Sequence, residues 1–214
     1  MLFRTRLDAG LALGERLGSY YGRRGVRVLG LPRGGIPVAF EVARRLDAPL
    51  DVFVVRKLGV PGQEELAMGA IASGGVRIVN DDVVSALGLS QATLDRVAGI
   101  EQAELERREK SYRGSRPALD VVDATVIVVD DGLATGSTMR AAVAALRQQK
   151  PAAIVVAVPV AAPSTRDELA REVDEIVCVA TPDPFIAVGR FYDDFAQTTD
   201  GEVRDLLARA ARRG

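Results

Sequence analysis

Short apolar runs alternate with amphipathic stretches along most of this chain, and that alternation restricts its fold more than any other feature. The apolar runs have the length of buried strands and occupy residues 26–31, 50–55, 125–129, 154–160 and 175–179. The stretches around them repeat apolar residues at helical spacing and occupy residues 8–21, 36–46, 137–149, 164–171 and 201–212. Strands that alternate with helices form parallel βαβ units. We therefore expect an α/β fold, with an open, mainly parallel, Rossmann-like sheet that carries helices on both faces.

The middle of the chain departs from this alternation. Residues 59–65 form a polar stretch that predicts a loop. Two apolar runs then flank Ser73-Gly74-Gly75, as in a hairpin, at residues 68–72 and 76–79. Residues 81–112 are highly charged and helical in pattern, and we expect Gly88 and Gly99 to divide them.

Composition excludes several classes of function. With 28 basic and 29 acidic residues the net charge is −1, so we expect no nucleic-acid partner. There is no His, and the single Cys178 lies in an apolar run, so neither a disulfide nor a transition-metal site is expected, whereas Mg²⁺ remains compatible. The N-terminus lacks the apolar core of a signal peptide, and the longest apolar run, residues 152–162, is too short to span a bilayer. We expect a cytoplasmic protein without membrane contact.

The segment 126–138, VIVVDDGLATGST, has the residues of a sugar-phosphate site. A predicted strand ends in Asp130 and Asp131, whose carboxylates can accept hydrogen bonds from a diol such as the 2- and 3-hydroxyls of ribose. Small residues then lead to a predicted helix N-terminus, where free N–H groups and the helix dipole favour a phosphate. Hydroxyl groups add further donors, at Thr135, Ser137 and Thr138.

Other interpretations of this segment account for it less well. A plain βα turn with a Ser or Thr cap needs one capping residue, whereas here four phosphate-type residues follow two acids. A P-loop needs Gly-Lys-Ser/Thr, and a dinucleotide-binding loop needs Gly-x-Gly-x-x-Gly with an acid on the following strand. The segment contains neither pattern.

The segment resembles the signature of the type I phosphoribosyltransferases, enzymes that use 5-phosphoribosyl-1-pyrophosphate (PRPP). That signature is four apolar residues, two acids and a small-residue loop that ends in Thr-Gly-x-Thr. By this resemblance Asp130 and Asp131 face the ribose, and the 5-phosphate is held by Ala134, Thr135, Gly136, Ser137 and Thr138. The wider pattern of PRGG, RKLG, the acid-pair loop and an aromatic tail is similar to a group of bacterial predicted phosphoribosyltransferases. The resemblance covers essentially the whole chain and implies the type I fold, bound Mg²⁺ and, as in many similar proteins, a homodimer.

The Pro-Arg-Gly-Gly turn is a candidate diphosphate site. It follows the predicted strand at residues 26–31, Gly34 and Gly35 permit close approach of the backbone to an anion, and Arg33 supplies charge and donors. In the resembled family the first βα loop binds pyrophosphate, often through a strained or cis peptide. We predict pyrophosphate binding here, with a plain turn as the alternative.

Arg56 and Lys57 follow the predicted strand at residues 50–55, and two cations at its carboxyl end would neutralise a diphosphate. The alternative is two solvated charges. In the resembled family a mobile loop at the place of residues 59–65 closes over the reacting sugar. The arrangement is similar to that of the orotate-type enzymes, except that the loop here is acidic where theirs is basic.

The resemblance also implies an organisation of the chain. We expect a single domain over residues 1–214, with a core over about 22–180 and a helical insertion over about 81–112. The family places a variable hood over the base. Here that hood would combine residues 1–21 with residues 181–214.

The tail holds four of the ten aromatic residues within eleven positions, at Phe185, Phe191, Tyr192 and Phe195. Phe185, Phe191 and Tyr192 are the candidates for an acceptor pocket, because aromatic rings stack on planar bases. Packing of an irregular tail onto the sheet is the alternative interpretation for each of them.

The reaction implied by the resemblance displaces pyrophosphate from C1 of PRPP by a nitrogen of a base or amine. Mg²⁺ would act as a Lewis acid, and the protein would position the reactants and stabilise charge. The catalytic candidates are Asp130, Asp131, Arg56 and Lys57, with Asp131 one candidate for the general base. The alternative is a regulatory protein that binds PRPP without turnover. The acid pair together with both cationic motifs favours catalysis.

Overall fold

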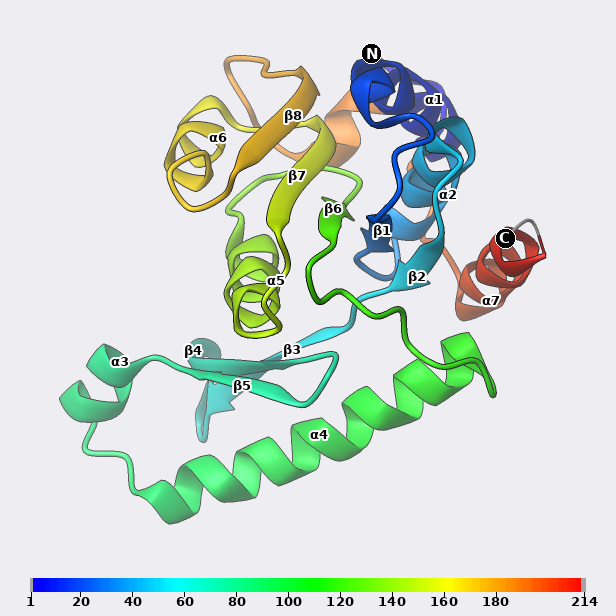
Figure 1. The fold of residues 1–214 in the computed structure, drawn as a ribbon. Coiled ribbons are helices and arrows are strands. Elements are labelled where there is room, and N and C mark those ends of the chain that lie inside the picture. The colour runs from blue at the N-terminus through cyan, green and yellow to red at the C-terminus, as the bar shows by residue number, and fades with distance from the viewer. Residues whose placement is uncertain (1, 213–214) are drawn as a thin grey trace.

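The protein is built around a five-stranded parallel sheet, in a computed structural model that describes residues 2–212 (Figure 1). Across the sheet the strands run in the order β2 (Leu50–Val52), β1 (Val26–Gly30), β6 (Thr125–Val129), β7 (Ala153–Val160) and β8 (Glu175–Ala180). Every neighbouring pair is parallel, as the sequence predicted.

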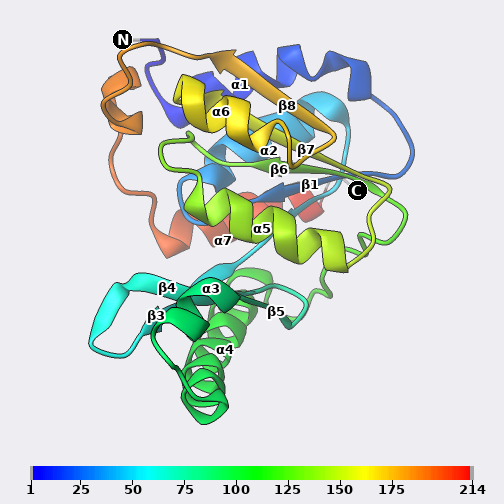
Figure 2. The same cartoon turned by 90° about the vertical axis from the view of Figure 1, so that its left-hand side faces the viewer.

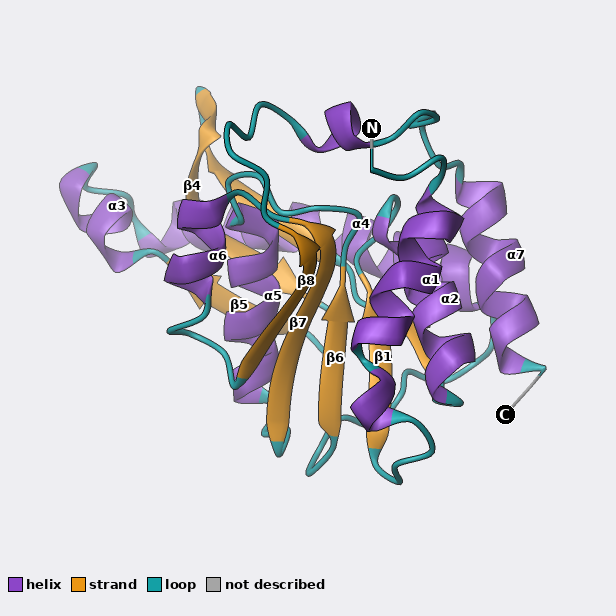
Figure 3. Ribbon diagram, turned by 90° about the horizontal axis from the view of Figure 1, so that it is seen from above, coloured by secondary structure: helices purple, strands orange, loops and turns teal. Residues whose placement is uncertain are grey.

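Helices cover both faces of this sheet, as expected (Figure 3). One face carries α5 (Ser137–Gln148) and α6 (Pro163–Leu169), and the other carries α1 (Arg6–Arg16), α2 (Gly35–Leu46) and α7 (Asp200–Ala211). Successive residues of β6 divide between two cores, with Ile127 beneath α2 and Val126 and Val128 beneath α5. Because both faces are buried, the strands are uninterrupted apolar runs.

A second, antiparallel sheet lies beside the first, between α5 and the long helix α4 (Gln91–Arg113) (Figure 2). Its strands are β3 (Val55–Val60), β4 (Gln63–Ala72) and β5 (Val76–Val79), and α3 (Asp81–Ala86) leads from it to α4. The hairpin predicted around Ser73-Gly74-Gly75 is confirmed as β4 and β5.

Two predictions in this part of the chain are wrong. The single strand predicted over residues 50–55 ends at Val52, and β3 begins at Val55 in the other sheet. The apolar run is continuous because Phe53 and Val54 are buried where the chain passes between the sheets. The loop predicted over residues 59–65 is instead the end of a hairpin, which turns tightly at Pro61-Gly62 and exposes polar residues because it projects into solvent.

The charged segment is helical, but it is divided once rather than twice. Gly88 lies between α3 and α4, whereas Gly99 lies inside α4 on an exposed face. The burial of Leu94, Ala98 and Leu105 holds the helix together through that position.

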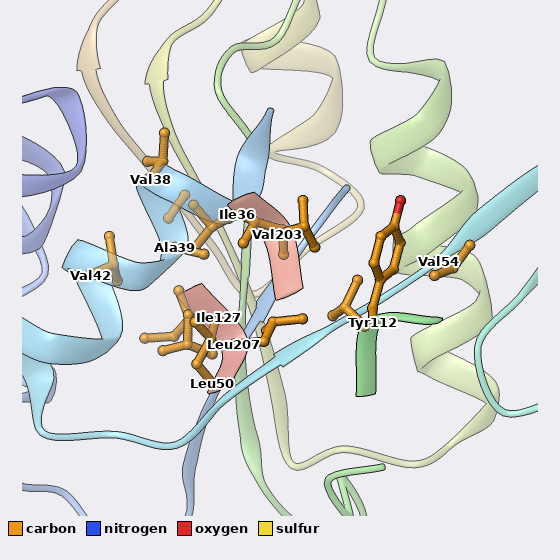
Figure 4. Packing of buried hydrophobic residues seen from close by; sticks show 14 of the residues in the cluster. Ile36, Val38, Ala39, Val42, Leu50, Val54, Tyr112, Ile127, Val203 and Leu207 are labelled. Carbon is orange, nitrogen blue, oxygen red and sulfur yellow. The ribbon is translucent and has the colours of Figure 1, made fainter. Parts of the chain in front are cut away.

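The cores of the two sheets join where α4 meets α7 and β2. Figure 4 shows Ile36 and Val42 of α2, Val203 and Leu207 of α7, and Tyr112 of α4 in one cluster. Tyr112 is buried, and its hydroxyl donates to Asp200 Oδ1 at 2.7 Å. The C-terminal end of α4 is thereby fixed against the main sheet.

The N-terminal segment meets the segment around Tyr192 on the side to which the strand arrows point, whereas α7 lies apart from both (Figure 3). Phe3 forms a β-bridge with Tyr192, just after the short helix η2 (Val188–Phe191). The N–H of Phe3 donates to the Phe191 carbonyl at 3.0 Å, and the N–H of Asp193 donates to the Phe3 carbonyl at 2.9 Å. These segments form a small hood, while α1, which the turn η1 (Gly18–Tyr20) follows, and α7 pack on α2.

None of the helices within residues 2–212 is both long enough and apolar enough to cross a lipid bilayer.

Candidate functional site

The site lies where the connections of the parallel sheet diverge. From β1 the chain proceeds through α2 to β2 on one side, and from β6 it proceeds through α5 to β7 on the other. Ligands of open parallel sheets bind at the carboxyl ends of the strands at such a point. The two loops are joined directly, because the N–H of Leu31 donates to the Val129 carbonyl at 2.9 Å.

The Pro-Arg-Gly-Gly turn packs against the acid pair with no space for a side chain. A Cβ atom on Gly34 would overlap the Asp131 carboxylate. A Cβ atom on Gly35 would lie 2.7 Å from the Val129 carbonyl oxygen and 2.9 Å from Asp130 Cα. The peptide bond between Pro32 and Arg33 is cis. The two sequence motifs, about one hundred residues apart, therefore border one site.

Arg33 is the cation that the turn brings to this edge. Its guanidinium has no carboxylate or carbonyl partner among the hydrogen bonds and ion pairs of residues 2–212. It lies close enough to Tyr112 to oppose the rise in the pKa of that hydroxyl, which burial and the Asp200 acceptor raise to about 12. A half-buried, unpaired guanidinium is available for an anion.

The two acids are held differently. Asp130 Oδ1 accepts a hydrogen bond from the N–H of Asp131 at 2.8 Å, and Asp131 Oδ2 accepts one from Arg6 Nε at 2.8 Å. Burial and the adjacent Asp131 charge raise the pKa of Asp130. Burial also raises the pKa of Asp131, and the Arg6 guanidinium opposes that rise.

The loop after the acids exposes a helix N-terminus. Ala134, Thr135, Ser137 and Thr138 are exposed, and Gly136 precedes α5 with a φ of +75°. Within residues 2–212 no side chain caps α5, so the alternative interpretation of this segment as a plain capped turn is wrong. A hydrogen bond from α6 holds this loop, because Thr165 Oγ1 donates to the Ala134 carbonyl at 2.6 Å. The N–H groups at the start of α5 therefore offer hydrogen-bond donors that an anion could take.

Arg56 and Lys57 lie elsewhere than predicted. They are in β3 of the antiparallel sheet rather than at the carboxyl end of a parallel strand. Arg56 Nε donates to Glu101 of α4 at 2.7 Å, and Lys57 Nζ donates to the Glu65 carbonyl at 3.0 Å. No hydrogen bond or ion pair of residues 2–212 links either cation to the acid pair, so their assignment to the site stays a prediction.

The tail aromatics form two groups. Tyr192 is 2% exposed, lies between the rings of Phe3 and Phe195, and donates its hydroxyl to the Asp131 carbonyl at 2.6 Å. Tyr192 therefore helps to hold the backbone at Asp131 in place. Phe185 and Phe191 are half-buried, with ring centroids 5.2 Å apart. The acceptor pocket stays a prediction for all three predicted residues, and the half-exposed rings are the ones open to an acceptor.

Sequence reasoning missed Arg6. It stands 125 positions before its partner Asp131 and belongs to no motif. It also missed Val188, which lies so close to Gly132 that any side chain at that position would overlap it. Neither contact has a local signal, because each joins the loop after β6 to a segment that is distant in sequence.

Comparison with known proteins agrees with this geometry. Residues 8–195 match the family described as phosphoribosyl transferase domain. Two curated relatives from Mycobacterium tuberculosis, strains CDC 1551 and H37Rv, are provisionally named phosphoribosyl transferases and are each 49% identical over 211 residues. The alignment spans 99% of this chain but 47% of each relative, so the chain corresponds to about half their length.

A solved structure resembles nearly the whole chain. The crystal structure of TT1426 from Thermus thermophilus has a TM-score of 0.86 and 42% sequence identity, and the match covers 98% of this chain and 99% of that one. The second sheet and the long helix α4 lie within the matched length, so they belong to an architecture that the two proteins share.

Proposed function

The chain belongs to the phosphoribosyltransferase family of transferase enzymes, and on that premise we propose that it binds PRPP and transfers the 5-phosphoribosyl group to a nitrogenous base or amine, with release of pyrophosphate. One observation supports this proposal most. Gly34 and Gly35 pack directly on Asp131 and Asp130, so the loop predicted to bind diphosphate adjoins the acids predicted to bind ribose.

The proposal divides PRPP among three parts of the site. The 5-phosphate binds the uncapped N-terminus of α5, at Ala134, Thr135, Gly136, Ser137 and Thr138. The ribose hydroxyls donate to the acid pair at the end of β6. The diphosphate lies against Gly34 and Gly35 and takes the free guanidinium of Arg33. Each part matches the charge and the hydrogen-bonding groups of its portion of PRPP.

The chemistry requires positioning and charge stabilisation more than a protein nucleophile. The bond between C1 and the diphosphate oxygen breaks, the bond between C1 and the acceptor nitrogen forms, and the proton of that nitrogen passes to a carboxylate. Positive charge develops on the ribose ring, beside Asp130 and Asp131, while negative charge collects on the leaving group, beside Arg33. A site with this charge order favours the transition state over the bound substrate.

The residues at the site fit Mg²⁺ that is bound mainly by the substrate. Within residues 2–212 no group of three or more His, Cys, Asp or Glu side chains could hold a metal by itself. Asp130 is a suitable oxygen donor, because among the described hydrogen bonds only its Oδ1 atom is engaged. When bound, Mg²⁺ supplies Lewis-acid neutralisation of the diphosphate.

A regulatory protein that binds PRPP without turnover is the second candidate. The placement of Arg56 and Lys57 favours it, because both cations are paired within the β3–α4 region. Arg33 is then the one cation of the three predicted that is free to stabilise the leaving group. Affinity for PRPP without catalysis would follow from such a site.

The experiment that separates these functions is PRPP-dependent release of pyrophosphate, measured with Mg²⁺ and a panel of bases and amines. Turnover with any acceptor establishes the transferase, and tight PRPP binding without turnover across the panel favours the regulator. The variant Asp130→Asn/Asp131→Asn should lose PRPP affinity, whereas the exposed control Asp167→Asn should keep it. Unchanged PRPP affinity in the double variant would contradict both functions.

A further inference from the structure

Arg6 connects the acid pair to the tail through three contacts. Its Nε atom donates to Asp131 Oδ2 at 2.8 Å, and its Nη1 atom donates to the Ala196 carbonyl at 2.8 Å. Its guanidinium carbon lies 3.9 Å from the centroid of the Phe195 ring. The Arg6 and Asp131 side chains are 11% and 16% exposed, so this ion pair is screened much less than a surface pair.

The backbone on both sides of Arg6 is held by hydrogen bonds that do not involve its side chain. The N–H of Asp194 donates to the Arg4 carbonyl at 2.8 Å, which continues the pairing of the two terminal segments. Thr5 then caps α1 by accepting the N–H of Asp8. Arg6, the first residue of α1, therefore projects toward Asp131 from a preset position.

Asp131 and Asp130 differ in what holds them. Asp131 is bound to the terminal segments twice, by its carboxylate to Arg6 and by its carbonyl to the Tyr192 hydroxyl at 2.6 Å. The Asp130 carboxylate takes one hydrogen bond, from the backbone N–H of its neighbour. Each carboxylate therefore keeps one oxygen that no described hydrogen bond engages, but only the charge of Asp131 is balanced by a cation.

We infer that Arg6 is a positioning residue that keeps Asp131 in an ion pair with the hood, so that Asp130 carries the uncompensated charge of the pair and is the main partner of the ribose hydroxyls. This inference rests on the proposed function, since it concerns how the two acids divide the binding of PRPP.

The cost of the opposite arrangement supports this assignment. If the ribose displaced Arg6, a nearly buried guanidinium would lose its carboxylate partner, and separating such a pair is strongly unfavourable. Binding to Asp130 requires no such separation, and neither does a weaker contact to the remaining Oδ1 atom of Asp131. Arg6 also balances one of two adjacent negative charges at a site that must receive an anionic substrate. The same contact fixes the tail at Phe195 and Ala196, so the hood and the ribose site are held as one unit.

The test measures the affinity for PRPP in the presence of Mg²⁺ for a set of full-length variants. Asp130→Asn should lose at least about a hundredfold, whereas Asp131→Asn should stay within about threefold, because an Asn oxygen still accepts from Arg6. Arg6→Met should lose about tenfold, the lower limit for a charge-assisted hydrogen bond, and Arg6→Lys should lose less. The control is Arg4→Met, whose side chain is 82% exposed, and it should leave the affinity unchanged.

The double variant Arg6→Met/Asp131→Asn distinguishes positioning from direct binding. It removes both charges of the pair, so PRPP affinity should return to within about threefold of the wild type. If Asp131→Asn fails to restore affinity to Arg6→Met, Arg6 acts on the ligand itself or on the fold, and the inference is overturned. Equal losses in Asp130→Asn and Asp131→Asn would overturn it as well. A wild-type protein that binds no PRPP would instead contradict the proposed function, and the inference with it.

Discussion

This chain has two cationic motifs, Arg33 in the Pro-Arg-Gly-Gly turn and Arg56-Lys57 in β3. Both could neutralise a diphosphate by their charge, but they differ in their place in the fold and in their ion pairing. Arg33 follows a strand of the parallel sheet and its guanidinium is unpaired within the described residues. Arg56 and Lys57 lie inside an antiparallel hairpin and are paired to Glu101 and Glu65. The difference shows that the place of a cation in the sheet, more than its charge, decides whether it is available to an anion.

The variant with the largest expected effect on PRPP affinity is Gly34→Ala. The added Cβ would overlap the Asp131 carboxylate, so that side chain or the turn must shift. We expect the affinity for PRPP to fall by at least about a hundredfold, since the shift disturbs the turn and the ion pair of Asp131 with Arg6 together. Isothermal titration with PRPP and Mg²⁺ measures this, and retained helical circular dichroism serves as the control for folding. Unchanged affinity would show that the two motifs act separately.

The comparison predicts unequal effects for the two arginines. Arg33→Gln should weaken binding of pyrophosphate by about tenfold to a hundredfold, because it removes the charge of a charge-assisted hydrogen bond. Arg56→Gln should change it by less than about twofold. Titration of both variants with pyrophosphate is the measurement. Equal losses would mean that Arg56 leaves Glu101 to bind the diphosphate. The two arginines would then be equally available to an anion, which contradicts the difference proposed here.

For Arg56 the expected effect is on stability. Arg56→Gln removes a partly buried ion pair with Glu101, in which the Arg and Glu side chains are 28% and 21% exposed. The free energy of unfolding should fall by about 1 kcal/mol, between the values for surface and buried pairs. Urea denaturation of this variant and of Glu101→Gln should give similar losses. A loss confined to Arg56→Gln would indicate a partner for Arg56 other than Glu101.

The smallest expected effect is a gain at Gly99, within the helix that carries Glu101. An added Cβ there meets no atom within 4 Å, and Ala is a better helix former than Gly. Gly99→Ala should raise the free energy of unfolding by about 0.5–1 kcal/mol and leave PRPP affinity unchanged. A change in PRPP affinity in this variant would show that α4 and the site are coupled.

The sequence predicted those parts of the molecule whose signals are local. The strand Thr125–Val129, the acids that follow it and the uncapped start of α5 are contiguous, so one segment contains the whole half-site. The Pro-Arg-Gly-Gly turn was predicted for the same reason. Its contact with Asp130 and Asp131 follows from the rule that ligands collect at the carboxyl ends of parallel strands.

The wrong predictions concern the place where the chain passes from one sheet to the other while its residues stay apolar. Phe53 and Val54 continue an apolar run after the parallel strand has ended, so no pattern marks the passage from β2 to β3. The displacement of Arg56 and Lys57 follows from that unmarked step. Arg6 was missed because its contact with Asp131 joins the N-terminal segment to a loop 125 residues later, which no local pattern reports.

The most direct test of the central claim is a crystal structure of the protein with PRPP and Mg²⁺ bound. The account predicts the 5-phosphate on the N–H groups at the start of α5, the ribose hydroxyls on Asp130, and the diphosphate on Gly34, Gly35 and the Arg33 guanidinium. A diphosphate bound instead to Arg56 and Lys57, with the Pro-Arg-Gly-Gly turn free of ligand, would contradict it.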